Sequence, residues 1–168
     1  KCPKKLVVIG AGYIGLELGT VWARLGAKVE VIEFLPRILP GMDDEIAKKF
    51  MAIAKKQGLS FRLSTAVKQA KPSKAGVTLT VEPADGGKPE SISADIALVS
   101  VGRHPATDGL GLKAAGVALT ERGRIAVDAR FETSLDDVYA IGDVIDGPML
   151  AHKAEEDAVA AVEMMAGK

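Results

Sequence analysis

The 168-residue sequence has few of the residues from which several kinds of site are built. Its one cysteine, Cys2, leaves no partner for an internal disulfide or for a Cys-x-x-Cys motif. Because 22 lysines and arginines balance 22 aspartates and glutamates, no net charge attracts nucleic acid or an anionic membrane. Apolar runs such as Leu6 to Ile9 are far shorter than the roughly 20 residues that span a bilayer, and no secretory leader is visible. We therefore expect a soluble protein with small-molecule partners, and neither nucleic-acid nor membrane binding.

The first part of the sequence predicts alternating strands and helices. A short β-branched run at residues 6–9 is typical of a strand that is buried on both faces of a parallel sheet. Apolar residues at helical spacing predict a helix over about 13–25, which Gly26 would end. Residues 28–32 then alternate as a second strand.

A second helix should follow a stretch that contains two prolines. Asp43 or Asp44 can cap its N-terminus, and its apolar face would carry Ile46, Phe50 and Ile53. The resulting β-α-β-α order is that of a dinucleotide-binding half.

Residues 60–94 have a two-residue period instead. Val77, Leu79 and Val81 alternate with threonines, and the turn-rich segment 84–88 predicts a hairpin loop. We expect an antiparallel meander inserted into the parallel sheet.

The next segment predicts the end of the first domain. Residues 95–101 return to an apolar run, which indicates a buried strand, and Gly102 ends that strand abruptly. The sequence thus predicts an α/β fold in which domain 1–102 has a Rossmann-type parallel sheet with an antiparallel β-meander insertion.

The remaining residues, 103–168, predict a less regular segment. Glycine-spaced loops connect short strands near 125–127 and 138–141, and a helix follows over about 150–165.

Three glycines after the first strand form the motif Gly10-Ala-Gly12-Tyr-Ile-Gly15. Gly10 would permit a tight turn, Gly12 would let the backbone approach a pyrophosphate, and Gly15 would allow close packing of helix on strand. The helix N-terminus adds N–H groups and about half a positive charge. Glycines at this spacing also arise by chance or serve packing alone. The preceding strand and the following helix favour dinucleotide binding.

Glu33 stands at the end of the second strand, about twenty residues after the glycines. A carboxylate there can accept a hydrogen bond from the adenosine ribose 2′-OH, but it repels a 2′-phosphate. This favours NAD over NADP, while the alternative is a solvated glutamate at a strand end.

Four further segments point to a known family: the run from Val7 to Gly26, Val101-Gly-Arg103-x-Pro105, Thr133-Ser134 with Val138-Tyr-Ala-Ile-Gly-Asp143, and Gly147-Pro-Met-Leu-Ala-His-Lys-Ala-Glu-Glu-Asp157. Together they resemble the dihydrolipoyl dehydrogenases, which are flavin-dependent pyridine nucleotide-disulfide oxidoreductases. The resemblance covers essentially the whole chain. It implies that residues 1–102 are the NAD domain and that residues 103–168 are the second, incomplete segment of a split FAD domain.

The resemblance also implies which residues bind each cofactor. Tyr13 would cover the flavin face and move aside for the nicotinamide, Glu17 would lie near the nicotinamide, and Asp143 would bind the FAD ribitol. The implied NAD residues are Gly10, Ala11, Gly12, Tyr13, Ile14, Gly15, Glu17, Glu33, Val67 and Gly102, and the implied FAD residues are Asp143, Met149, Leu150, Ala151 and His152.

The resembled enzymes oxidise dihydrolipoamide through a redox disulfide and FAD and pass hydride to NAD+. The redox cysteines and the catalytic base would lie outside these 168 residues, so we expect no catalytic residue and no metal site here. The complete enzyme would be a homodimer that serves a lipoyl-bearing protein, in the bacterial cytoplasm or the mitochondrial matrix. Two alternatives remain: another NADH-dependent flavoprotein, such as an NADH oxidase or a disulfide-reductase relative, or a stand-alone nucleotide-binding module.

Overall fold

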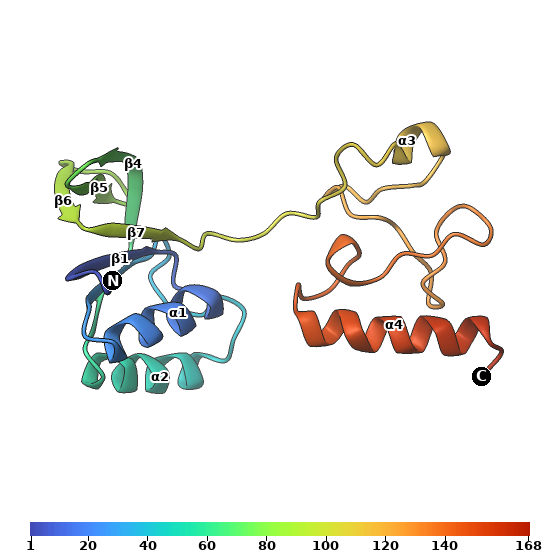
Figure 1. The fold of residues 1–168 in the computed structure, drawn as a ribbon, viewed down its shortest axis with the longest axis horizontal. Coiled ribbons are helices and arrows are strands. Elements are labelled where there is room, and N and C mark those ends of the chain that lie inside the picture. The colour runs from blue at the N-terminus through green and yellow to red at the C-terminus, as the bar shows by residue number, and fades with distance from the viewer. The chain divides into compact units, whose positions relative to one another are not determined.

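A four-stranded parallel sheet forms the centre of residues 1–102 (Figure 1). The computed structural model describes residues 1–168. The strands follow the order β3-β2-β1-β7, and all neighbours are parallel. Their bounds are β1 (Lys5–Ile9), β2 (Lys28–Ile32), β3 (Leu59–Arg62) and β7 (Ile96–Val99).

The two faces of this sheet are covered by different layers. Helices α1 (Tyr13–Arg24) and α2 (Asp44–Lys56) lie on one face, where Leu6 and Val8 join their core (Figure 1). Val7 points to the other face, because successive strand side chains alternate. Burial on both faces explains why β1 reads as an uninterrupted apolar run.

The opposite face is covered by the predicted antiparallel meander. Its strands, β4 (Thr65–Ser73), β5 (Gly76–Pro83) and β6 (Glu90–Ala94), are hydrogen-bonded in the order β4-β5-β6. Leu79 and Val81 of β5 are buried against the core residues of the sheet. The parallel sheet with this insertion confirms the predicted α/β fold.

The meander begins later than the sequence indicated. Residues 59–62 form β3, which pairs parallel to β2, instead of belonging to the antiparallel strands. The predicted buried strand 95–101 is also shorter: β7 lies at the edge of the sheet, and Ile96 and Val99 are exposed. β3 and β7 have only four residues each, and the residue pattern of so short a strand does not show which sheet it joins or how deeply it is buried.

Small residues provide most of the fully buried positions of both helices, and larger apolar residues such as Phe50 of the predicted face pack partly buried against the same core. On α2, Ala47 and Ala54 are buried, whereas Ile46 and Ile53 of the predicted face are more than half exposed. On α1, the buried residues are Gly15, Leu16 and Gly19. Small side chains let a helix axis approach the sheet closely, so they face the core although larger apolar residues stand beside them.

Residues 103–168 form a second compact unit, as residues 1–102 form the first. Its helices are α3 (Leu112–Ala115), the 3₁₀ turn η1 (Gly142–Val144) and α4 (Ala151–Met165). The expected strands near 125–127 and 138–141 are absent. Single bridges pair Leu119 with Ile125 and Glu132 with Tyr139. A small core holds the unit together, built on Val117, Ile125, Ala140 and Ile145.

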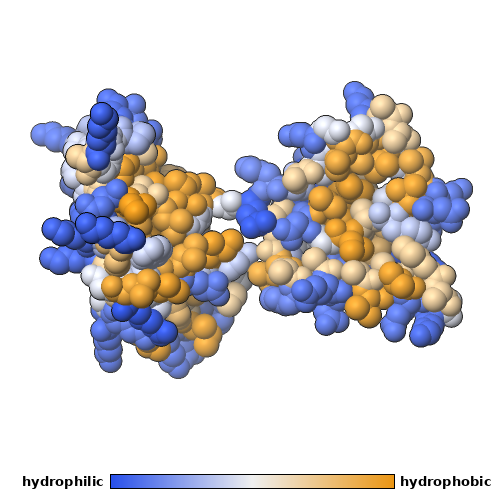
Figure 2. Space-filling view, viewed as in Figure 1, coloured by the Kyte–Doolittle hydropathy of each residue, from blue (hydrophilic) through white to orange (hydrophobic).

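Apolar residues also gather at the surface of both units (Figure 2). In the second unit, Val159, Val162 and Met165 of α4 are at least half exposed. No helix of the chain is long and apolar enough to cross a membrane.

Candidate functional site

The three glycines after β1 have three different surroundings. Gly10 has φ +99°, and a Cβ built on it would lie 2.4 Å from the backbone oxygen of Ser100. A Cβ on Gly15 would lie 2.3 Å from the backbone oxygen of Gly10. Both positions exclude a side chain, because backbone atoms of the turn and of the segment after β7 already occupy the space.

Gly12 has no such constraint. Its backbone is extended, with φ −72° and ψ 173°, and a Cβ there would meet nothing within 4 Å. It is the N-cap of α1, without a side-chain cap, and the first turn of the helix contains no acidic residue. The open space therefore lies where a helix N-terminus favours an anionic group. A pyrophosphate fits these surroundings.

Glu33 follows β2 and is almost buried, at 8% exposure. Its Oε2 accepts a hydrogen bond from the N–H of Ala11 at 2.6 Å, and its Oε1 accepts one from the N–H of Leu35 at 2.9 Å. A carboxylate has about four acceptor sites, so each oxygen retains capacity for a ligand hydroxyl. The buried Glu33 carboxylate thus holds the backbone of the glycine turn in place through its bond to Ala11.

The loop after β2 closes on the glycine turn through residues that the sequence analysis did not identify. The N–H of Leu39 donates to the oxygen of Ala11 at 2.9 Å. Arg37 donates to the backbone oxygens of Leu39 and Met42 and pairs with Asp44. A lone basic residue between two prolines gave no sequence signal for this role, since each of its contacts depends on the folded loop.

The other implied NAD residues also lie within the first unit. Tyr13 is the first residue of α1 and is exposed, and Glu17 is exposed one turn later. Val67 of β4 is paired with Val81 and packs against the meander core. The remaining positions are Ala11, which is buried, Ile14, which is half-buried on α1, and Gly102, which is exposed at the end of the unit.

In the second unit, Asp143 lies in η1 next to the buried Gly142 and is itself partly exposed. Its Oδ2 lies 3.3 Å from the guanidinium of Arg103. In the sequence Arg103 stands out only as part of a motif, because 40 residues separate it from Asp143.

The implied flavin segment, Met149 to His152, leads into the first turn of α4. Leu150 is the N-cap and provides no side-chain cap, and the first turn again contains no acidic residue. Ala151 and His152 are exposed. An uncapped helix N-terminus suits an edge of the flavin ring on which negative charge accumulates.

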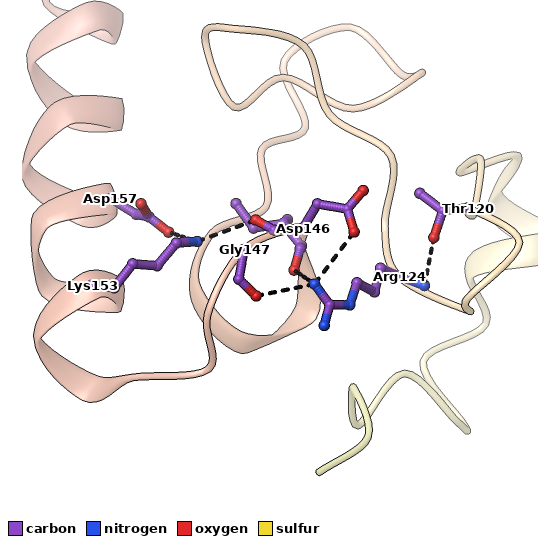
Figure 3. A network of polar contacts seen from close by, with 7 residues as sticks. Thr120, Arg124, Asp146, Gly147, Lys153 and Asp157 are labelled. Carbon is purple, nitrogen blue, oxygen red and sulfur yellow. Dashed lines mark hydrogen bonds and ion pairs between the residues drawn. The ribbon is translucent and has the colours of Figure 1, made fainter. Parts of the chain in front are cut away.

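Side chains from two directions hold the loop between these flavin positions (Figure 3). Arg124 donates to the oxygens of Ile145 and Gly147 at 3.3 and 3.1 Å and contacts the Asp146 carboxylate at 3.3 Å. From α4, Lys153 donates to the oxygen of Asp146 at 3.5 Å.

Asp157 connects α4 to η1. Its Oδ2 accepts from the Nζ of Lys153 at 2.5 Å and from the N–H of Gly142 at 3.0 Å. Burial opposes ionisation of this carboxyl, but the hydrogen bonds from Lys153 and Gly142 and the charge of Lys153 outweigh it and lower the pKa of Asp157. Asp157 is therefore an anion at neutral pH.

No group of three or more His, Cys, Asp or Glu side chains is placed to hold a metal ion.

The family model of the pyridine nucleotide-disulphide oxidoreductases matches residues 1–158. The chain belongs to this family, and the resemblance inferred from its motifs is confirmed.

Within this family, the chain is similar to dihydrolipoyl dehydrogenases. The chain is 58% identical over 166 residues to the mitochondrial dihydrolipoyl dehydrogenase of Pisum sativum, covering 99% of this chain and 33% of that protein. Against the mitochondrial dihydrolipoyl dehydrogenase of Bos taurus the identity is 53% over 169 residues, with the same coverage of 99% and 33%.

Among solved structures, the HOCl-induced flavoprotein disulfide reductase of Escherichia coli has a TM-score of 0.88 at 30% identity. That match covers 100% of this chain and 37% of the other. The chain spans about a third of the length of the curated relatives it matches.

Proposed function

We propose that residues 1–102 bind NAD at the glycine turn. The observation that carries this proposal is the contrast between Gly12 and the two other glycines. Packing alone explains Gly10 and Gly15, whereas no protein atom occupies the space that a Cβ on Gly12 would need. An approaching pyrophosphate explains the absence of a side chain there.

The arrangement of Glu33 supports NAD over NADP. Hydrogen bonds from two backbone N–H groups hold the carboxylate in place, and its free acceptor sites suit the ribose hydroxyls. Tyr13 and Glu17 would face the nicotinamide half, and Val67 and Gly102 would border the rest of the dinucleotide.

Residues 103–168 would supply the second segment of an FAD domain. Asp143 would accept hydrogen bonds from the ribitol, and residues 149–152 would place the first turn of α4 at the ring edge. When bound, FAD would supply an acceptor for two electrons from a dithiol and a donor of hydride to NAD+. The partial exposure of Asp143 and the uncapped α4 N-terminus fit these contacts.

For the complete protein we propose dihydrolipoyl dehydrogenase activity. It would use a redox disulfide and a base outside this chain, form a dimer and act on a lipoyl-bearing partner. The relatives reported above are named as mitochondrial, which favours the mitochondrial matrix over a bacterial cytoplasm. Lipoamide-dependent reduction of NAD+ by the full-length protein tests this assignment, and full-length protein without that activity contradicts it.

The glycine contrast gives a direct test of NAD binding. Gly12→Ala should change the free energy of unfolding by less than about 1 kcal/mol, because its φ suits alanine and the space is open. The same substitution should weaken NADH binding tenfold or more, about 1.4 kcal/mol, because the added methyl displaces the pyrophosphate. Fluorescence titration with NADH and urea unfolding of the 168-residue chain measure both quantities.

Gly15→Ala is the matched control. Its Cβ meets the backbone oxygen of Gly10, so it should lower the free energy of unfolding by about 1–3 kcal/mol. If Gly12→Ala binds NADH as tightly as the unmodified chain, the dinucleotide does not approach this turn and the proposal is wrong.

A further inference from the structure

The two implied flavin positions, Asp143 and residues 149–152, are joined by the end of η1 and a loop of residues 145–148. This loop is positioned by side chains that do not belong to the proposed flavin contacts (Figure 3). Arg124 binds it from one side and Lys153 from the other. A shift of the loop would therefore move both flavin positions.

Asp157 is the anion that holds Lys153 of α4 and Gly142 of η1 in place. Both of its hydrogen bonds end on one atom, Oδ2, which accepts from the Lys153 ammonium and the Gly142 N–H. The side chains of Lys153 and Asp157 are only 20% and 12% exposed, so solvent screens the pair weakly. Gly142 directly precedes Asp143, so this bond fixes the backbone next to the proposed ribitol ligand.

Close packing leaves this arrangement little freedom. A Cβ on Gly142 would lie 3.0 Å from the Cβ of Ala154 on α4. A Cβ on Gly147 would lie 3.0 Å from Cε and 3.2 Å from Nζ of Lys153. Both glycines also have positive φ angles, +72° and +125°. The turn and the loop are therefore built to lie directly against α4 and its lysine.

Lys153 is the third residue of α4, and its cation stands at the positive end of the helix. The first turn contains no acidic residue that could offset it. Asp157, one turn further along, provides the compensating charge. The charges of Lys153 and Asp157 thus set the electrostatic potential at the N-terminus of α4, where residues 149–152 lie.

We propose that Asp157 is a positioning residue of the flavin site and that, with Lys153, it sets the charge that a bound flavin experiences. Its hydrogen bond to Gly142 holds Asp143 in place, and its negative charge offsets Lys153. This inference rests on the proposed flavin-binding function of residues 103–168.

The test uses the full-length protein, in which FAD affinity is measured by reconstitution of apoprotein and the flavin midpoint potential by spectroscopic titration. Asp157→Ala removes both hydrogen bonds, including the one that holds Gly142 beside Asp143, and should weaken FAD binding about tenfold, which corresponds to about 1.4 kcal/mol. Asp157→Asn retains an oxygen that can accept both bonds, so FAD affinity should change less than threefold.

The flavin midpoint potential shows whether the charge of Asp157 acts on the flavin or whether Asp157 has only a structural role. Asp157→Asn leaves the Lys153 cation uncompensated and should shift the midpoint potential upward, because the cation favours the reduced, more negative flavin. Lys153→Met leaves the anion uncompensated and should shift it downward. Glu156→Gln, an exposed carboxylate on the same helix, is the control and should shift neither quantity.

Shifts of the same sign in Asp157→Asn and Lys153→Met, or no shift beyond the control, would overturn the inference. Thermal unfolding of each apoprotein identifies a variant that fails to fold, and the midpoint potentials of the folded variants then decide.

Asp143→Ala distinguishes failure of the proposed flavin-binding function from failure of the role proposed for Asp157. If it binds FAD with unchanged affinity, the proposed flavin function fails. If it loses FAD while the Asp157 and Lys153 variants resemble Glu156→Gln, only the present inference fails.

Discussion

At the scale of single residues, the same amino acid serves different physical purposes within one motif. Gly10 and Gly15 are glycines because backbone atoms occupy the space of a side chain, and Gly12 is a glycine although that space is open. A position whose lack of a side chain has no explanation within the protein is the one that points to a ligand. The same contrast separates Gly142 and Gly147, which pack against α4, from glycines in open loops.

The carboxylate of Glu33 should determine cofactor choice. A 2′-phosphate near it would cost on the order of 1–4 kcal/mol per charge pair, so NADH should bind at least tenfold more tightly than NADPH. In Glu33→Gln the charge is lost and the preference should shrink to a few-fold. Fluorescence titrations of the 168-residue chain with both nucleotides measure the ratio.

Glu33→Gln should also destabilise the chain. An amide has one oxygen, so it cannot accept from both Ala11 and Leu35 as the carboxylate does. Glu30→Gln is the control, since Glu30 lies on β2, just before Glu33, but pairs with Lys5 and Arg62. Equal affinities of the unmodified chain for NADH and NADPH would contradict the role assigned to Glu33.

At the scale of elements, aspartate side chains of the first unit accept hydrogen bonds from backbone N–H groups at the starts of a helix and a strand. Asp43 caps α2 by accepting from the N–H groups of Glu45 and Ile46 at 2.9 and 3.0 Å. Asp95, just before β7, accepts from the N–H groups of Lys4 and Lys5 at 2.6 and 2.9 Å. The first bond begins a helix, and the second ties the starts of β7 and β1 together.

The Asp95 bonds predict a pH dependence of stability. The hydrogen bonds from Lys5 and Lys4 lower the pKa of Asp95 below its ordinary value, because they stabilise the carboxylate. A lowered pKa in the folded state contributes stability that is fully present above the unfolded value of about 3.9 and is lost as the pH falls through the folded value. Unfolding should therefore become easier below about pH 4.

Asp95→Asn should flatten this part of the stability profile, whereas Asp85→Asn, in an exposed turn, should retain it. Urea unfolding between pH 2.5 and 7, followed by the fluorescence of Trp22, measures the effect. Trp22 is the only tryptophan and lies in α1, so it reports on the first unit. Identical profiles for Asp95→Asn and the unmodified chain would show that these bonds do not couple folding to protonation.

At the scale of the whole molecule, the chain consists of two units with separate cores. The first contains both core clusters of the parallel sheet, together with the glycine turn and Glu33. The second has a small core, and one side of α4 remains exposed and apolar at Val159, Val162 and Met165. We expect the first unit to be the more stable of the two.

Residues 1–102 alone should therefore fold and bind NADH with the affinity of the 168-residue chain, within about twofold. The physical reason is that every bond described around the glycine turn joins residues of this unit. Circular dichroism, urea unfolding and NADH titration of the shortened chain test this. Gly12→Ala in the same background should fold and lose the binding. A shortened chain that folds cooperatively without binding NADH would show that the second unit contributes to the site.

The sequence by itself determined the family, the order of the first four elements, the meander and the residues of the glycine turn. These features depend on spacing along the chain: a period of two or of 3.6, glycines at fixed intervals, and an N-cap before a helix. The position of Glu33 at the end of β2 also follows from spacing alone.

Only the tertiary structure decided which face of each helix is buried, that residues 59–62 join the parallel sheet, and what Glu33, Asp143 and Asp157 contact. The apolar stripe of α2 indicated Ile46 and Ile53, yet Ala47 and Ala54 face the sheet because close packing favours small side chains. Arg103 with Asp143, and Asp157 with Gly142, are pairs 40 and 15 residues apart. Such pairs have no local pattern, because the two partners are brought together only by the packing of the elements that carry them.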